Sequence, residues 1–300
     1  MYIFKLGFLL NFFISNFVVV NFWFFFSFFL QECRLENLID VNLNGCKFIT
    51  ELPKLQAPNL ENLNLSFCKN LVKLTELGAP NLGYLKLSEC KNLVILPSQL
   101  RLKSLDTFYL SGCSSLEKLP NFHPEMECLK TLDLKGSGIR EVPSSIEHLT
   151  TLEDLILIKC KNLRDLPNSI YKLQQLQELV TPTAKLRPTC DSFDGSSRYR
   201  FLNMRELDFS GFDGIIELDL LMNPDYFPTL GRIDLSDTNI VTIPESISRF
   251  PRLNELYARN CELLREIQGL PQPMSRVYVF GSMLLNTSPS GLFNQVSLFL

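Results

Sequence analysis

Cysteines are the residues in this sequence whose type and spacing first invite a chemical interpretation. Nine are present, together with only two histidines, His123 and His148. No Cys-x-x-Cys pair occurs, so the usual spacing of zinc ligands and of dithiol redox centres is missing. A Cys–His nucleophile would need an oriented histidine beside the thiol, and nothing in the sequence indicates such a grouping. We therefore predict no catalytic residue, no metal ligand and no cofactor, in a protein that is not an enzyme.

Six of the nine cysteines share one position in a repeated pattern. Two apolar residues separated by one residue precede each of them, as in Leu63-x-Leu65-x-x-Cys68. A small side chain with a hydrogen-bond donor can satisfy backbone groups left open where the chain bends away from a strand. These cysteines are thus expected to be free structural thiols, of the kind that a reducing compartment preserves. The pattern places them at Cys46, Cys68, Cys90, Cys113, Cys160 and Cys261, with Ser137, Thr238 and more loosely Phe212 in three further copies.

The elements that must hold these positions follow from the alternation of residues around them. Apolar and polar residues alternate over each short segment, which predicts a strand with one face in the core and one in solvent. The copies are mostly 21 to 24 residues apart, so the strands are expected to stack as one parallel sheet over residues 41–279. Leucines such as Leu71 and Leu74 should point inward from the return arcs, and prolines such as Pro143 should end them. The predicted fold is an α/β leucine-rich-repeat solenoid, a horseshoe of roughly eleven repeats with the parallel β-sheet on its concave face.

Departures from the repeat set the predicted boundaries. A leucine-rich-repeat domain is expected over residues 31–285, with an irregular polar loop at 183–200, and residues 286–300 form a C-terminal tail. Residues 1–30 hold 11 of the 24 phenylalanines, and no charge occurs from 6 to 30. A helix of that length would reach about 37 Å, enough to cross a bilayer. Three interpretations stay open for this segment: a membrane anchor, a misassigned first exon, and a buried start to the solenoid.

Charge narrows the classes of partner. The chain carries 29 basic and 32 acidic residues for a net charge of −3, and both signs are mixed along it. No basic block is present, so a nucleic-acid partner is not expected. An open sheet also lacks the enclosed pocket that small ligands need, which favours a folded protein as the partner.

Solvent-facing positions of the predicted strands form the candidate binding surface, because they line the concavity on a rigid sheet. Five of the ten candidates are Tyr or Arg, the types enriched at interface hot spots. We expect Tyr84, Tyr109 and Ile156 to supply most of the affinity, and we expect Ile156 and Ile158 to be exposed. The alternative is that specificity lies on the 183–200 loop. The candidates are Tyr84, Lys86, Tyr109, Asp133, Ile156, Asp208, Arg232, Asp234, Tyr257 and Arg259.

The sequence of the repeats resembles that of a known family. The segments concerned are Leu-x-Leu-Ser-x-Cys-Lys-Asn-Leu at 85–93, Leu-Ser-Gly-Cys-Ser-Ser-Leu-Glu-Lys-Leu-Pro at 110–120 and Ile-Arg-Glu-Val-Pro-Ser-Ser-Ile at 139–146. They look like the repeats of plant intracellular disease-resistance receptors, which join a TIR domain, a nucleotide-binding domain and leucine-rich repeats (TIR-NBS-LRR). The likeness covers about 35–295 of the sequence.

The resemblance implies a protein-binding recognition module of a plant innate-immunity receptor, located in the cytoplasm. Its partner would be a pathogen effector, a guarded host protein, or the receptor's own nucleotide-binding domain, which the repeats would restrain. The sequence holds no Gly-x-x-x-x-Gly-Lys-Ser/Thr loop and no TIR-like region, so we expect the sensing arm without its signalling parts. The alternative is a membrane-anchored receptor-like protein, with one span at residues 6–30 and extracellular repeats. In that case Asn64, which begins an Asn-Leu-Ser sequon, would be open to glycosylation.

Overall fold

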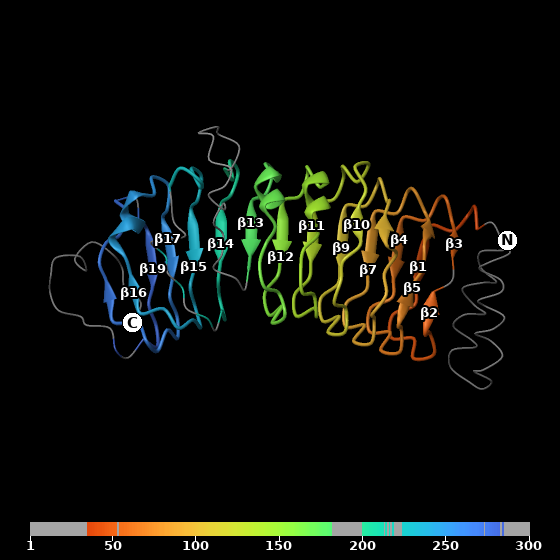
Figure 1. Cartoon of the computed structure of the whole chain (residues 1–300), viewed down its shortest axis with the longest axis horizontal. Coiled ribbons are helices and arrows are strands. Elements are labelled where there is room, and N and C mark those ends of the chain that lie inside the picture. Colours follow the sequence, from red (N-terminus) through yellow and green to blue (C-terminus); the bar gives the residue numbers. More distant parts are fainter. Residues whose placement is uncertain are drawn as a thin grey trace.

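The computed structural model describes residues 35–52, 54–181, 200–212, 214, 216, 218, 224–272, 274–282 and 284. Within them, each turn of the chain adds one short strand to the same parallel sheet (Figure 1). This confirms the predicted leucine-rich-repeat solenoid. The eleven strands, in spatial and sequence order, are β1 (Asp40–Asn42), β4 (Asn62–Asn64), β7 (Tyr84–Lys86), β9 (Thr107–Tyr109), β11 (Thr131–Asp133), β12 (Asp154–Ile156), β13 (Glu178–Val180), β14 (Glu206–Asp208), β15 (Arg232–Asp234), β17 (Glu255–Tyr257) and β19 (Arg276–Tyr278).

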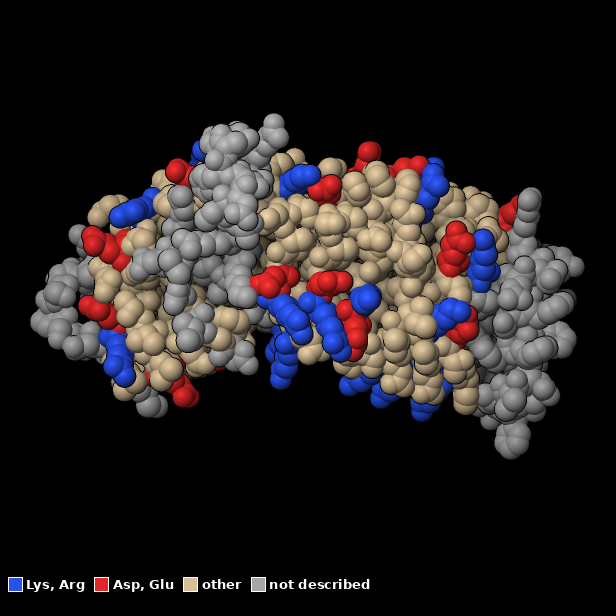
Figure 2. Space-filling model, viewed as in Figure 1, with Lys and Arg blue, Asp and Glu red and all other residues tan. Residues whose placement is uncertain are grey.

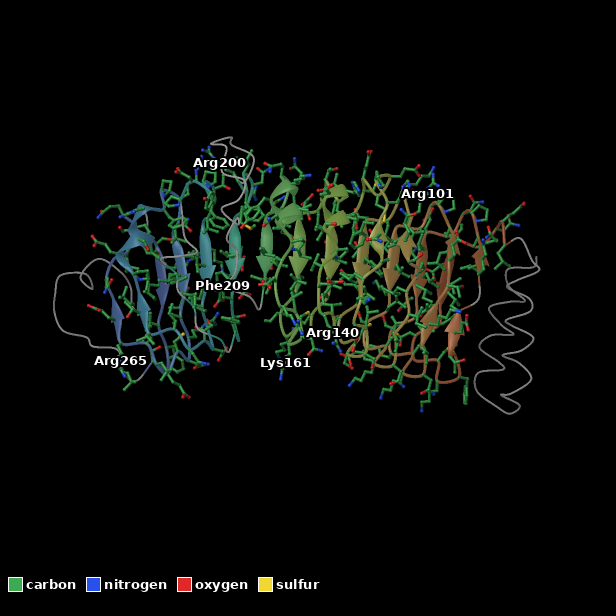
Figure 3. The ribbon with its side chains drawn as sticks, in the orientation of Figure 1. Arg101, Arg140, Lys161, Arg200, Phe209 and Arg265 are labelled. Atoms are coloured by element: carbon green, nitrogen blue, oxygen red, sulfur yellow. The ribbon has the colours of Figure 1, made fainter. Side chains whose placement is uncertain are left out.

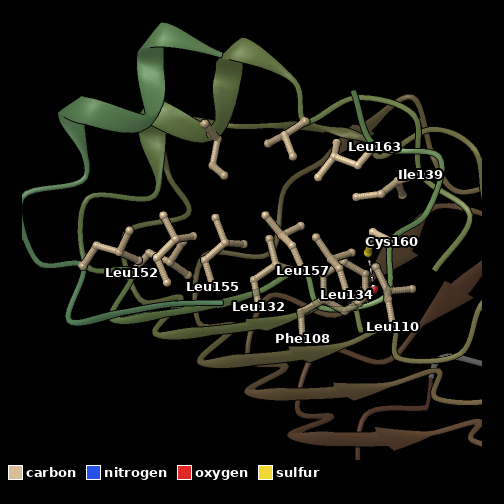
Figure 4. Packing of buried hydrophobic residues seen from close by; sticks show 14 of the residues in the cluster. Phe108, Leu110, Leu132, Leu134, Ile139, Leu152, Leu155, Leu157, Cys160 and Leu163 are labelled. Atoms are coloured by element: carbon tan, nitrogen blue, oxygen red, sulfur yellow. Dashed lines mark hydrogen bonds between the residues drawn. The ribbon is translucent and has the colours of Figure 1, made fainter. Parts of the chain in front are cut away.

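Strand register fixes which side chains form the core. The middle residue of each strand pairs with the middle residue of the next, as Leu85 does with Phe108. These residues and the ones two positions later, such as Leu110 and Leu134, are almost all buried, and they pack in successive layers (Figure 4). Alternation with a period of two therefore places one face of the sheet in the core and leaves the other outside.

The return arcs are short and irregular. Four two-stranded parallel sheets cross them: β2 (Glu51–Leu52) with β5 (Lys73–Leu74), β3 (Leu55–Gln56) with β6 (Leu77–Gly78), β8 (Gln99–Leu100) with β10 (Asn121–Phe122), and β16 (Thr242–Ile243) with β18 (Glu266–Ile267). In the described ranges, three 3-10 helices each begin directly after a proline with extended backbone: η1 (Ser144–His148), η2 (Asn168–Lys172) and η4 (Glu245–Arg249). The fixed φ of proline suits the residue that starts a helix, so Pro143 leads into a 3-10 helix within the arc, whereas it was expected to end the arc. Leu71 and Leu74 are buried, as expected.

The cysteine position works as a ladder between turns. The Cys68 thiol donates to the Leu43 carbonyl (Sγ to O, 3.1 Å), and Cys90 donates to Leu65 in the same way (3.0 Å). Cys113, Cys160 and Cys261 repeat the bond with carbonyls of the preceding turn, and Figure 4 shows that of Cys160 to Leu134. All cysteines in the described part of the chain are free. Burial raises the pKa of Cys68 to about 12 and that of Cys90 to about 11, so both remain protonated donors.

The residue that precedes the ladder position was not singled out by the sequence pattern. It adopts a left-handed backbone in every described copy, which costs little for glycine and about 1–2 kcal/mol for other residues. The chain uses glycine at only half of these positions. They are Gly45, Gly112, Gly136, Gly211 and Gly281, and with side chains Phe67, Glu89, Lys159, Asp237 and Asn260.

The described part of the weak repeat, residues 176–181, keeps its place in the sheet. Thr181 takes a core position and is buried, and its N–H donates to the Asp208 carbonyl (2.9 Å). Most of the predicted 183–200 loop, the segment at 1–30 and the tail at 286–300 lie outside the described residues. Among the residues described, none belongs to a helix long and apolar enough to cross a membrane.

Candidate protein-binding face

Two rows of side chains run across the concave face. The rows are named by position in the three-residue strands. The first row holds the first residue of each sheet strand and the third row holds the third, while the middle residues point into the core. Because the strands are parallel and in register, row members on adjacent strands are direct neighbours, about 4.8 Å apart. The face is therefore a regular grid of solvent-side positions.

The structure brings most of the predicted residues into these rows. Tyr84 and Arg232 stand in the first row, and Arg259 follows two residues after β17. The rest stand in the third row, in the order Lys86, Tyr109, Asp133, Ile156, Asp208, Asp234 and Tyr257, with buried Val180 between Ile156 and Asp208.

The three predicted aspartates each accept a hydrogen bond from the backbone just after their strand. The backbone N–H two residues later donates to one carboxylate oxygen of Asp133 (2.9 Å), Asp208 (2.6 Å) and Asp234 (2.9 Å). Asn42 and Asn64 accept the same bond in the first two turns. Asp234 is only 5% exposed, so the expected solvent-facing carboxylate is in fact buried at the strand end.

Tyr84, Tyr109 and Ile156 do not form one contiguous patch. Tyr84 is 45% exposed and pairs with Thr107, so it lies in a different row from Tyr109. Asp133 separates Tyr109 from Ile156 in the third row. Tyr109, Ile156 and Ile158 are half-buried. Ile156 and Ile158 are therefore less exposed than expected.

Arginines and tyrosines gather at the C-terminal end of the face. The Arg232 guanidinium carbon lies 4.3 Å from the Tyr257 ring centroid, and that of Arg259 lies 5.0 Å away. The Tyr257 and Tyr278 rings stack with centroids 4.7 Å apart. Such cation–π and stacking contacts hold these side chains in place. Tyr278 was not among the predicted residues, although it stands at the same repeat offset as Tyr257.

The first row also contains acidic residues that the sequence reasoning missed. Asp154 pairs with Glu178, and Glu178 pairs with Glu206. Burial raises the pKa values of Glu178 and Glu206, and neighbouring carboxylates raise them further. Arg232 partly offsets this effect, with its Nε 3.3 Å from Glu206 Oε1. Their shared offset with Tyr84 in the repeat would have identified all three.

Comparison with known proteins agrees with this architecture. Residues 101–280, more than half of the chain, match the family model described as leucine-rich repeats of RPS4B-like disease resistance proteins. The chain belongs to this family. This resistance-protein repeat domain carries the ladder and rows described above as part of its repeat.

Individual relatives are also disease-resistance proteins. TMV resistance protein N of Nicotiana glutinosa is 31% identical over 232 residues, covering 62% of this chain and 20% of that protein. A putative disease resistance protein of Arabidopsis thaliana is 29% identical over 185 residues, covering 62% of this chain and 13% of the relative. The resistance-protein repeat domain thus spans a fifth or less of the length of these two relatives. Among solved structures, the functional domain of InlJ from Listeria monocytogenes has a TM-score of 0.43 at 16% identity, covering 82% of this chain and 59% of that one.

The concave face of the resistance-protein repeat domain is an open surface of the kind that repeat proteins use to contact other proteins. In the part of the chain that the structure describes, no three His, Cys, Asp or Glu side chains gather so as to hold a metal ion. The grid instead alternates aromatic, aliphatic and charged side chains on a rigid sheet. That mixture is suited to a protein surface of matching shape and charge.

Proposed function

We propose that this repeat domain is the protein-recognition module of a plant immune receptor and that it binds a folded protein on its concave face. The observation that carries the proposal is the unbroken register of the two rows across eleven strands. Membership of the disease-resistance family supplies the immune context. The partner is a pathogen effector, a guarded host protein, or the nucleotide-binding domain of the receptor itself.

Side chains of the concave face that accept no hydrogen bond from a backbone N–H are the best binding candidates. In the third row, Asp133, Asp208 and Asp234 accept backbone bonds, whereas Lys86, Tyr109, Ile156 and Tyr257 do not. Aromatic and aliphatic groups lose little on desolvation, so they supply affinity, while charges fix orientation and speed encounter.

Proximity labelling in leaf cells tests the proposal. The full chain is fused to a biotin ligase and compared with a variant carrying Ala at Tyr84, Tyr109 and Ile156. The matched control carries Ala at Val72, Val94 and Ile95, which are 40%, 49% and 47% exposed on the return arcs. We expect the concave variant to lose partners that the control retains. Equal retention or equal loss in both variants would contradict the proposal.

The 183–200 loop is the competing location for specificity. A third variant with a shortened loop joins the comparison. If partners survive the three concave substitutions but vanish when the loop is shortened, the concave assignment is wrong and the sheet is a scaffold.

We also propose a cytoplasmic location, supported by thiols that serve as hydrogen-bond donors rather than disulfides. Mass spectrometry of the protein from plant tissue tests this location. We expect free Cys68 and Cys90 and an unmodified Asn64. A Cys68–Cys90 bridge or a glycan on Asn64 would instead favour the membrane-anchored alternative with extracellular repeats.

A further inference from the structure

Ion pairs elsewhere in the solenoid join opposite charges on successive turns. Lys54 pairs with Glu76 (2.8 Å), Arg101 with Glu125 (2.7 Å), Arg140 with Glu117 (2.6 Å) and Lys172 with Glu147 (2.7 Å). Figure 2 shows acidic and basic side chains side by side in small mixed groups, and Figure 3 labels Arg101 and Arg140 among them. Stacking one repeat on the next normally sets a positive side chain against a negative one.

The sheet face over β12, β13 and β14 breaks this rule. Asp154, Glu178 and Glu206 stand directly opposite one another in the first row. Asp208 lies beside them in the third row and faces Asp234. Like charges directly opposite on neighbouring strands destabilise a sheet. The raised pKa values of Glu178, Glu206 and Asp208 reflect burial first and then these neighbouring carboxylates.

Among the residues that the structure describes, few cations lie beside this acidic stretch. Arg232 lies 3.3 Å from Glu206 and 3.5 Å from Asp234, and it already contacts the Tyr257 ring. Asp154, Glu178 and Asp208 make no ion pair with any residue that the structure describes. Within the described ranges, the negative charge on this part of the sheet is therefore only partly neutralised.

Apolar side chains lie beside these carboxylates. Ile156 shares strand β12 with Asp154, and Ile158 lies in the turn that follows the strand. Both are half-buried, so each still presents surface to a partner. A metal ion or a polyamine would gain nothing from these isoleucines, whereas a protein segment would bury them.

We infer that the face formed by β12, β13, β14 and β15 docks a basic segment of a protein, in which Lys or Arg side chains flank an apolar residue. The inference rests on the proposed function of the concave face and narrows it to one partner chemistry. The basic side chains pair with Asp154, Glu178 and Asp208, and the apolar residue packs on Ile156 and Ile158. Complementary charge of this kind also speeds association.

Fluorescence anisotropy with a labelled Gly-Arg-Leu-Arg-Leu-Arg-Gly peptide tests the inference on the full chain. A matched peptide with Glu in place of Arg is the negative probe. The test variant carries Glu178→Gln with Glu206→Gln. The control carries Glu117→Gln with Glu147→Gln, which changes the net charge equally on the return arcs.

We expect binding of the Arg peptide to fall about tenfold in the test variant and to stay unchanged in the control. Ile156→Ala should also weaken it.

Several outcomes would overturn the inference. They are no binding of the Arg peptide, equal losses in both glutamine variants, and competition by spermine combined with no effect of Ile156→Ala. Failure here is separable from failure of the proposed function. If the peptide does not bind but Ala at Tyr84 and Tyr109 still abolishes partner labelling, only the basic-segment inference falls.

Discussion

The thiols of Cys68, Cys90, Cys113 and Cys160 each share their acceptor carbonyl with a backbone N–H. The Leu65 carbonyl accepts the Cys68 N–H from its own turn (3.2 Å) and the Cys90 thiol from the next (3.0 Å). One carbonyl thus closes its own turn and is linked to the next turn. Ser137 and Thr238 show that a hydroxyl fits the same place, and Thr238 donates to the carbonyl of its own turn, Leu235 (2.6 Å).

Replacing Cys90 separates the size of the side chain from its hydrogen bond. Cys90→Ser should cost at most about 1 kcal/mol, because the hydroxyl keeps a donor for the Leu65 carbonyl. Cys90→Leu should cost about 1–3 kcal/mol through overpacking. Loss of the donor adds little, since the Leu65 carbonyl retains the Cys68 N–H. Urea unfolding measures both changes, and a serine variant as unstable as the leucine variant would contradict the hydrogen-bond role.

Gly138 is predicted to be intolerant of any side chain. An added Cβ would overlap the Ser114 carbonyl oxygen and lie 2.9 Å from its carbon, and both atoms belong to the backbone. Its N–H donates to the Cys113 carbonyl (3.1 Å), which limits relaxation. Gly138→Ala should therefore destabilise the fold by about 1–3 kcal/mol. Gly83→Ala is the control, because its Cβ would approach nothing closer than 3.7 Å. Similar urea midpoints for the two variants would refute the steric argument.

At the scale of the strand, pairing of side chains decides stability along the sheet. Opposite charges across turns stabilise the return arcs, whereas Asp154, Glu178 and Glu206 oppose one another. A natural sheet keeps such a repulsive arrangement when function gains from it. This links the stability of β13 to the binding face.

The acidic pairing predicts a pH dependence with a definite sign. The folded-state pKa of Glu178 is raised above that of the unfolded chain, so the fold loses stability as the pH rises through the unfolded value, and the loss is complete above the folded value. Glu178→Gln should therefore stabilise the protein at neutral pH by about 0.2–1 kcal/mol. The difference from the unsubstituted chain should shrink as the pH falls and disappear below about pH 4, where the unfolded carboxyl is also protonated. Urea unfolding at about five pH values between about pH 3.5 and about pH 8 measures this difference.

Glu125 gives the opposite sign and serves as the control. Its hydrogen bond to Arg101 lowers its pKa, so its stabilising effect is present at neutral pH and is lost as the pH falls. Glu125→Gln should not stabilise the protein at any pH. Stabilisation by both substitutions would point to a general effect of net charge instead of pairing within the sheet.

At the scale of the whole molecule, the solenoid has mainly nearest-neighbour contacts. Each described sheet strand is hydrogen-bonded within the sheet only to the strands next to it, and the core continues from turn to turn. The stability of such arrays is close to a sum of repeats and their interfaces. Local damage should therefore remain local.

Hydrogen exchange of Leu87→Ala tests this property. Leu87 is fully buried, so the substitution should cost about 2–5 kcal/mol. We expect faster exchange in β4, β7 and β9 and unchanged exchange in β15, β17 and β19. Uniform acceleration across all strands would show instead that the solenoid unfolds as one cooperative unit.

The sequence by itself determined the repeat, the parallel sheet, the buried rows and the task of the cysteines. These features depend on short-range alternation and on near-constant spacing, both of which can be read along the chain. Leu65-x-x-Cys68 and Leu87-x-x-Cys90 thus predicted stacked turns with a shared ladder, and the structure has them.

Only the tertiary structure decided which solvent-side residues are neighbours and how exposed each one is. Asp234 is buried because Ser236 and two arginines surround its carboxylate, and Ile156 is half-buried. Glu178 and Glu206 became a repulsive pair only when β13 and β14 came into register across 28 residues of chain. Register between strands so distant in sequence depends on the length and packing of the arc between them. Alternation within a single strand does not contain that information.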